Sequence, residues 1–124
     1  MSDYKIFNEK EKRKIFETVK KELSRFGIKS FLVYGSFVKR NYSKDLDLLV
    51  FDRISEERMN AIANTIEKKI KMEVDLRRFD ELPEPIKYLA VTQGKGELEE
   101  KVRRRVFDFL RVYMDFVEWV KKWS

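Results

Sequence analysis

With 124 residues, of which 43% are hydrophobic and 40% charged, the chain is expected to form one domain over residues 1–124. It contains no cysteine and no histidine, which excludes disulfide bonds, thiolate metal sites and imidazole bases, so any catalysis must use carboxylates, hydroxyls, lysines or metals. The net charge of +6 fits either a solvated helix surface or the attraction of a polyanion, but no basic motif is interleaved with aromatic residues, which argues against a nucleic-acid partner.

The first two elements predicted along the chain are an amphipathic helix and a buried strand. Asn8 and Glu11 have the spacing of a capping box, and Gly27 is expected to end the helix. Between these residues, apolar side chains recur at helical spacing at Ile15, Val19, Leu23 and Phe26. Residues 29–34 are predicted to form the first strand.

A second strand, a second helix and a third strand follow. The second strand is predicted over residues 46–51, and Ser55 is a suitable N-cap for the helix after it. The apolar stripe of that helix consists of Met59, Ile62, Ala63, Ile66 and Ile70. Residues 72–79 are predicted to form the third strand.

Two helices are predicted to complete the chain. Pro83 and Pro85 are typical of the first turn of a short helix, which is expected to end near Gly94. Residues 97–123 read as one helix, roughly 40 Å long at about 1.5 Å per residue. One apolar stripe of this helix contains Val102, Val106, Phe109, Tyr113, Phe116 and Val120, and a second contains Val112, Trp119 and Trp123. Because so wide an apolar surface is costly on an isolated monomer, we favour a partner protein or self-association over a monomer that buries all of it.

The most informative stretch runs from residue 31 to residue 51, FLVYGSFVKRNYSKDLDLLVF. Gly35 and Ser36 end the first strand at a break where backbone N–H groups can turn toward an anion such as a phosphate. Asp45 and Asp47 open the second strand, and the alternation of a strand places both carboxylates on the same face. Two carboxylates at this spacing suit a hard divalent cation.

A third carboxylate, Asp75, lies within the third predicted strand. Its neighbours Val74 and Leu76 are apolar, so Asp75 is expected to point away from them toward the same polar face as Asp45 and Asp47. An unpaired charge within an apolar run is expensive, which favours a functional role over an ordinary surface charge.

Together, GSFVKRNYSKDLDLLVF and VDLRRFDELP resemble the minimal nucleotidyltransferases, the small MNT branch of the DNA polymerase β-like superfamily. The resemblance covers residues 28–96. It implies the nucleotidyltransferase fold, an α/β (α+β) fold with a small mixed sheet backed by helices, here followed by a long C-terminal helix. It also implies that Gly35 and Ser36 hold the nucleotide triphosphate, and that Asp45, Asp47 and Asp75 are the catalytic carboxylates that bind Mg²⁺, with two ions expected.

The resemblance implies a reaction and a partner as well. Nucleotidyltransferases of this branch transfer AMP from ATP to an acceptor hydroxyl, and many MNT proteins are antitoxins paired with a HEPN-domain ribonuclease toxin. Such an antitoxin either adenylylates its partner on a tyrosine or holds it in a complex. Three hypotheses follow: a protein adenylyltransferase, a binding antitoxin that uses its aromatic C-terminal helix and has little catalysis, and, less favoured, transfer of AMP to an antibiotic or an RNA end.

Three features depart from the family's usual pattern. Residues 38–41 replace a small-Arg-Gly run, the interval between Gly-Ser and Asp-x-Asp is eight residues and therefore slightly short, and Lys44 stands where serine is usual. Asn41 tolerates the left-handed backbone that glycine would provide. Lys39 and Arg40 are candidates for neutralising phosphates, with solvent-exposed charges as the alternative, and Lys44 is expected to compete with Mg²⁺ or to contact phosphate.

Two further expectations concern the setting of the protein. The first residues have no apolar signal region and no run approaches the length of a membrane span, so we expect a cytoplasmic protein with no membrane contact. The abundance of lysine and glutamate and the absence of cysteine are typical of a thermophilic source.

Overall fold

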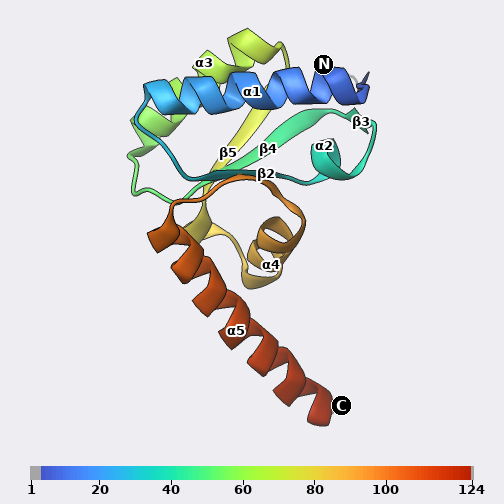
Figure 1. Cartoon of the computed structure of the whole chain (residues 1–124), viewed down its shortest axis with the longest axis vertical. Helices are drawn as coiled ribbons and strands as arrows, with labels where there is room; N and C mark the ends of the chain where they lie inside the picture. Colours follow the sequence, from blue (N-terminus) through green and yellow to red (C-terminus); the bar gives the residue numbers. More distant parts are fainter. Residues whose placement is uncertain (1–3, 124) are drawn as a thin grey trace.

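Helices cover both faces of a central sheet in the computed structural model, which describes residues 4–123 (Figure 1). In chain order the elements are β1 (Lys5–Ile6), α1 (Glu9–Arg25), β2 (Phe31–Tyr34), α2 (Ser36–Lys39), β3 (Tyr42–Ser43), β4 (Asp45–Val50), α3 (Glu56–Ile70), β5 (Glu73–Arg78), the 3₁₀ turn η1 (Phe79–Glu81), α4 (Glu84–Gln93), β6 (Lys95–Glu97) and α5 (Glu100–Lys122). The predicted α/β fold, with a small mixed sheet backed by helices and a long C-terminal helix, is confirmed.

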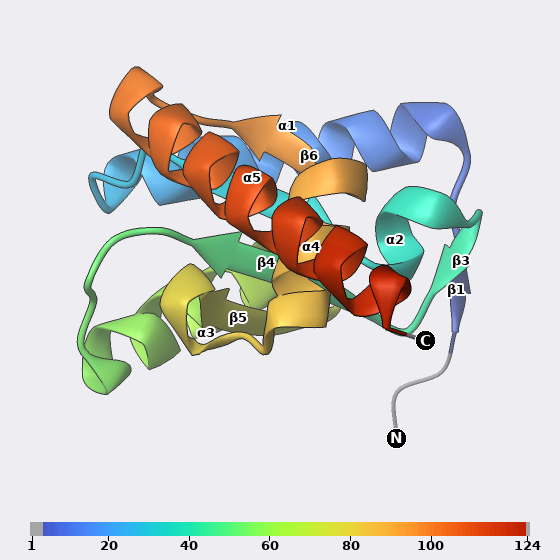
Figure 2. The ribbon, with the colours of Figure 1, turned by 90° about the horizontal axis from the view of Figure 1, so that it is seen from below.

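The central sheet has four strands in the order β5-β4-β2-β6. β4 and β5 are parallel, whereas β2 is antiparallel to both of its neighbours. β1 and β3 form a separate antiparallel pair beside α2 (Figure 2). Two adjacent parallel strands need a crossover connection, and α3 provides it between β4 and β5.

The first helical layer consists of α1 and α3. The predicted capping box at the start of α1 is present: the side chain of Asn8 accepts a hydrogen bond from the backbone N–H of Glu11 at 2.8 Å, and the Glu11 carboxylate accepts from the N–H of Asn8 at 3.0 Å. Ser55 caps α3 as predicted, because its hydroxyl accepts from the N–H of Arg58. The core under this layer contains Val19, Leu23, Phe31, Val33, Leu46, Leu48, Val50, Ile62 and Ile66.

The second helical layer consists of α4 and the first half of α5. Its core contains Leu32, Leu49, Phe51, Phe79, Leu82, Ala90, Val102 and Val106. Neighbouring residues of one strand face opposite layers: Leu48 lies in the α1 and α3 core, whereas Leu49 lies in the α4 and α5 core. Each fully buried side chain of this size stabilises the fold by about 1.5–3 kcal/mol, so the two cores hold the sheet from both sides.

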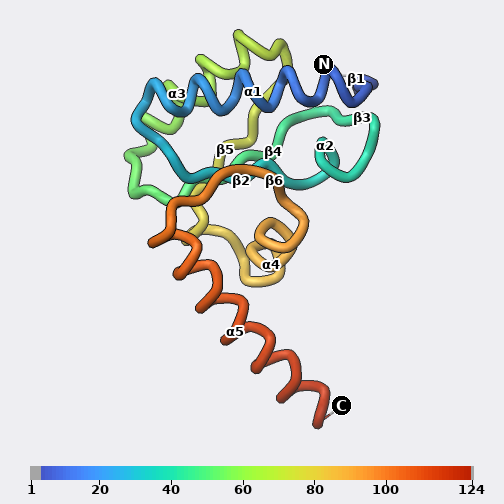
Figure 3. The backbone as a smooth tube through the Cα atoms, viewed as in Figure 1, coloured from blue at the N-terminus to red at the C-terminus, as the bar shows by residue number. Residues whose placement is uncertain are grey.

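Five short elements, β1, α2, β3, η1 and β6, were not expected from the sequence. The break after Gly35 contains the four-residue helix α2, and the long terminal helix begins at Glu100 instead of residue 97. Residues 95–97 form the edge strand β6, which pairs with β2 (Figure 3). All three residues of β6 are exposed, so the strand has no apolar alternation that a sequence pattern could reveal.

Helix α5 is anchored at one end only. Near its start Val106 is buried, Arg105 forms an ion pair with Asp80 at 3.1 Å, and further along Tyr113 stacks on Tyr88 with ring centres 5.0 Å apart. The helix then runs past α4 and away from the sheet (Figures 1 and 3). Its second half carries what we call the distal face, formed by Val112, Phe116, Trp119, Val120 and Trp123, all of them exposed. The monomer therefore leaves this aromatic surface uncovered, as the sequence led us to favour.

Within residues 4–123, no helix is long and apolar enough to cross a membrane.

Candidate active site

Three aspartates lie together on the side of the sheet that faces α4. Asp47 on β4 is directly across from Asp75 on the parallel strand β5, and Asp45 precedes Asp47 by two residues on the same face. Leu49 continues this face into the α4 and α5 core, which fixes the side of the sheet. On the other flank, Tyr34 of β2 is the cross-strand partner of Asp47. We call the surface formed by Asp45, Asp47 and Asp75 the acid face.

Negative charge on the acid face is poorly compensated. Partial burial, followed by the charges of Asp45 and Asp75, raises the pKa of Asp47 to about 6, and Arg77 partly opposes the shift. The pKa of Tyr34 is raised to about 12, first by burial and then by the charges of Asp47 and Asp75. A cation bound beside Asp47 would remove this electrostatic cost, and oxygen ligands are those that Mg²⁺ prefers.

Gly35 joins the two sequence motifs in space. Its φ of 79° lies in the left-handed region, and a Cβ added to it would lie 2.3 Å from Oδ2 of Asp47. Any other residue would therefore strain the backbone and collide with the carboxylate. Ser36, the first residue of α2, is exposed beside this contact. The Gly-Ser break and the Asp-x-Asp pair are thus parts of one site, because the side chain of Asp47 occupies the space that a side chain at residue 35 would need.

Asp75 differs from the other two aspartates because the protein supplies its counterion. Nε of Arg77 donates to Oδ1 of Asp75 at 2.8 Å, and this hydrogen bond raises the pKa of Arg77. Across residues 4–123, no group of three or more Asp or Glu side chains is arranged so that it could hold a metal ion. The oxygen donors of Asp45 and Asp47 suit a hard divalent cation, and metal binding by Asp45, Asp47 and Asp75 stays a prediction.

The basic residues between the two motifs lie at the surface. Lys39 ends α2 and is exposed, as is Lys44. Arg40 is directed to Tyr42: Nη1 of Arg40 donates to the tyrosine Oη at 3.3 Å, and the guanidinium lies 5.7 Å from the ring centre. Asn41 does not have a positive φ, so the turn forms without a left-handed residue at that position. Phosphate binding by Lys39 and Arg40 stays a prediction.

The comparison with protein families decides the identity of the fold. The family model described as "Polymerase beta, Nucleotidyltransferase" matches residues 14–101, from α1 to the start of α5. The chain belongs to this nucleotidyltransferase family. The match includes the whole acid face and both neighbouring motifs. No curated protein matches the chain significantly.

Several solved structures share the fold of this nucleotidyltransferase. One, described as a toxin-antitoxin with AMP-PNP, has a TM-score of 0.63 and 18% identity, over 81% of this chain and 87% of that chain. Another contains a tri-AMPylated HEPN toxin from Shewanella oneidensis in complex with an MNT antitoxin, and matches with a TM-score of 0.56, 17% identity and 86% of each chain. A third, the toxin-antitoxin MntA-HepT, has a TM-score of 0.57 and 15% identity, over 88% and 89% of the chains.

Sequence reasoning missed two side chains of the candidate active site, Tyr34 and Arg77. Only Arg77 could have been found from the period of two along a strand. Arg77 follows Asp75 by two residues and must share its face, and Tyr34 immediately precedes Gly35 at the end of the neighbouring strand. The missing information was the register between strands, which places Tyr34 beside Asp47 and which a single sequence does not reveal.

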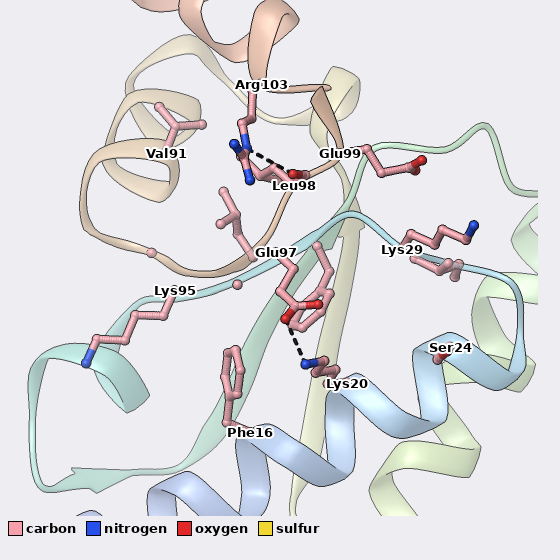
Figure 4. A pocket seen from close by; sticks show the side chains of 15 residues that line it. Phe16, Lys20, Ser24, Lys29, Val91, Lys95, Glu97, Leu98, Glu99 and Arg103 are labelled. Carbon is pink, nitrogen blue, oxygen red and sulfur yellow. Dashed lines mark hydrogen bonds and ion pairs between the residues drawn. The ribbon is translucent and has the colours of Figure 1, made fainter. Parts of the chain in front are cut away.

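A pocket of about 910 Å³ lies elsewhere, between α1, the β6 edge of the sheet and the start of α5 (Figure 4). Within it, Lys20 and Glu97 form an ion pair at 2.8 Å, and Nε of Arg103 donates to the backbone carbonyl of Leu98. None of the residues that line it belongs to the acid face. The pocket is therefore separate from the carboxylates and is not the candidate active site.

Proposed function

We propose that this nucleotidyltransferase transfers AMP from ATP to a hydroxyl group of a HEPN ribonuclease toxin and thereby acts as its antitoxin. The observation that carries the proposal is the contact between the Gly-Ser break and the acid face, because it brings a phosphate-binding backbone and carboxylates into one site. The similar fold of an MNT antitoxin found with a tri-AMPylated HEPN toxin supports the choice of acceptor, and that of a toxin-antitoxin with AMP-PNP supports an adenine nucleotide.

In the proposed reaction, the acceptor oxygen forms a bond to the α-phosphorus of ATP, the bond from that phosphorus to the bridging oxygen breaks, and pyrophosphate leaves. Gly35 and Ser36 would hold the triphosphate, and Asp45 and Asp47 would hold Mg²⁺. The metal, when bound, would offset negative charge on the phosphates. Asp75 would either complete the metal site or accept the proton that the hydroxyl loses.

Lys39 and Arg40 are proposed to assist at the phosphates, since both lie within or next to α2, directly after the Gly-Ser break. Arg40 would have to leave the ring of Tyr42 to do so. Lys44 precedes the first aspartate and is exposed, so it can reach solvent or a phosphate without entering the acid face.

We keep cytoplasmic location as a prediction, as this reaction consumes ATP.

A second candidate function is inhibition of the toxin by binding alone, and the distal face of α5 favours it. Trp119 is 59% exposed and Trp123 is 77% exposed, next to Val112, Phe116 and Val120. Large aromatic side chains of this kind dominate the binding energy of protein interfaces. We propose that the distal face binds the HEPN partner. Self-association through this face is the alternative, and it predicts a dimer in the absence of any partner.

The experiment that separates the two functions is to incubate the protein with a HEPN protein from the same genome and MgATP, and then to measure the mass of that HEPN protein. Transfer predicts the added mass of one or more AMP groups, lost in the Asp47→Asn variant. Asp52→Asn is the matched control, because Asp52 is exposed and follows the same strand outside the acid face. A stable complex with no added mass would exclude transfer and leave the binding function, and neither complex nor added mass would contradict both.

A further inference from the structure

The three aspartates of the acid face differ in their relation to the neighbouring arginine, Arg77. Asp45 and Asp47 are next to one another along β4, whereas Asp75 is bound by Arg77 from its own strand. The side chains of Arg77 and Asp75 remain 54% and 41% exposed, so the pair lies at the surface of the site, where solvent and ligands can reach it. The guanidinium of Arg77 therefore lies at the solvent-exposed edge of the candidate active site.

The position of Arg77 follows from the strand itself. Residues 75 and 77 share a face of β5 because they are two apart, while Arg78 points to the other side and binds the backbone carbonyl of Ile54 at 2.6 Å. The register places Arg77 opposite Leu49, two residue pairs further along than Asp47 and Asp75 and therefore on the same face of the sheet. A planar guanidinium held this way gives a directional contact to one carboxylate oxygen, which a mobile lysine would not.

The charge of the protein side chains alone favours a single metal ion. Before the nucleotide phosphates add their own negative charge, three carboxylates and one guanidinium leave two negative charges, which one divalent cation neutralises. A second divalent cation at Asp75 would have to displace Arg77 from Oδ1 and would be repelled by the guanidinium that stays nearby. The absence of any three-carboxylate metal group among residues 4–123 agrees with this division.

We propose that Arg77 takes the place of a second metal ion, so that the site binds one divalent cation, at Asp45 and Asp47, with the guanidinium as the permanent cation at Asp75. Arg77 is then a positioning residue that holds Asp75 through the hydrogen bond from its Nε to Oδ1. The inference rests on the proposed function for the identity of the site. It replaces the expectation of two Mg²⁺ ions with one ion and one arginine.

The test counts ions directly. The protein is saturated with AMP-PNP, and Mn²⁺ is titrated in and followed by electron paramagnetic resonance, which reports both the number of bound ions and any coupling between neighbouring ions. We expect one bound Mn²⁺ per chain and no coupled signal. In Arg77→Gln we expect a second bound Mn²⁺ with a coupled signal, because the neutral amide leaves Asp75 free. In Arg77→Lys, which keeps the positive charge, we expect one ion again.

Arg53→Gln is the matched control, since Arg53 is exposed in the loop after β4 and should leave the count at one. Two coupled ions in the unmodified protein would overturn the inference, and so would a single ion in Arg77→Gln. If the unmodified protein binds two ions and still transfers AMP, only this inference fails. If it binds no Mn²⁺ with AMP-PNP and transfers nothing, the proposed function fails as well.

Discussion

The acid face and the distal face of α5 depart from ordinary packing in opposite directions. On the acid face, carboxylates are held close together and partly away from water, and Asp47 has its pKa raised to about 6 as a result. On the distal face, Trp119 and Trp123 are exposed to water, with 59% and 77% of their surface accessible. Neither arrangement stabilises the isolated chain, and each would be stabilised by a ligand of the matching kind: a cation with nucleotide for the first, and an apolar protein surface for the second.

The difference also shows how each region is built. The carboxylates sit on central and edge strands that two cores hold rigidly, so their geometry exists before any ligand arrives. The distal face sits on helix α5, whose first half is packed on the domain. The last stacking contact with α4 is that of Tyr113 on Tyr88, and the helix then extends beyond α4 (Figure 1). A rigid chemical site and a projecting recognition helix should therefore respond independently to mutation.

The largest effect on partner binding is expected at the distal face. Replacing Trp119 and Trp123 together by alanine should weaken binding of the HEPN partner by at least about 100-fold, roughly 2.7 kcal/mol, because interface tryptophans are frequent hot spots. The melting temperature of the isolated protein should stay within about 2 °C, since both side chains are exposed. Affinity is measured by calorimetry with the purified partner.

Phe107→Ala provides the control on the same helix. Phe107 is 68% exposed, but it precedes Trp119 by twelve residues and so points about 120° away from the distal face. Its loss should leave the affinity within about threefold. Equal losses in the two variants, or no loss in either, would show that the partner binds a different surface.

The next effect isolates the contact between Gly35 and Asp47. Gly27 and Gly35 have the same φ of 79°, but an added Cβ meets nothing within 4 Å at Gly27, and at Gly35 it meets Oδ2 of Asp47 at 2.3 Å. Gly27→Ala should reduce the free energy of unfolding by about 1 kcal/mol, the cost of the left-handed backbone alone. Gly35→Ala should reduce it by about 3 kcal/mol, because a steric clash is added.

Urea unfolding of both variants measures the difference. In a double-mutant cycle, Asp47→Ala should recover most of the excess loss in Gly35→Ala and none of the loss in Gly27→Ala. Equal losses for the two glycines would mean that the carboxylate moves aside at little cost. In that case the Gly-Ser break and the acid face would be less tightly joined than the structure indicates.

The same comparison explains what the sequence could and could not predict. Asp45 and Asp47 share a face because of the strand period alone, so their juxtaposition could be predicted from local pattern. The approach of Asp75 to Asp47 depends on the parallel register of β4 and β5, and the motif resemblance was needed to suggest it. The ion pair of Asp75 with Arg77 was missed, although it needed only the same period of two.

For α5, the sequence gives the width of the apolar surface but not the point where packing stops. Tyr113 and Phe116 belong to one stripe at helical spacing, yet Tyr113 stacks on Tyr88 and Phe116 is 58% exposed. The packed part of α5 ends where the helix passes α4, because α4 is too short to cover the rest of α5. Such a limit is tertiary information and leaves no trace in the periodicity of the helix itself.

A smaller effect is expected when valine is replaced by alanine at one buried and one exposed position of α5. Val102 is 4% exposed and Val112 is 64% exposed. Val102→Ala should reduce the free energy of unfolding by about 2 kcal/mol, because it leaves a cavity in the α4 and α5 core. Val112→Ala should change it by less than about 0.5 kcal/mol while weakening partner binding. Similar destabilisation by both, in urea unfolding of the isolated chain, would mean that the distal face is covered in solution.

The smallest expected effect is the dependence of stability on pH at Asp47. Burial and the neighbouring carboxylates raise its pKa from 3.8 to about 6. The protonated form is therefore favoured by folding: its contribution to stability is fully present below about pH 4 and is lost as the pH rises through about 6. A shift of this size corresponds to roughly 3 kcal/mol, and partial exposure of the site reduces the expected contribution to about 1 kcal/mol.

Asp47→Asn removes this dependence. Measured by urea unfolding without metal, the variant should match the natural protein near pH 4 and exceed it by about 1 kcal/mol at pH 7, whereas Asp52→Asn should follow the natural protein throughout. Parallel curves for all three proteins would contradict the repulsion on the acid face. Because a divalent cation would offset the same repulsion, Mg²⁺ at pH 7 should stabilise the natural protein more than Asp47→Asn. This difference would connect the repulsion between the carboxylates to the ligand that they are proposed to bind.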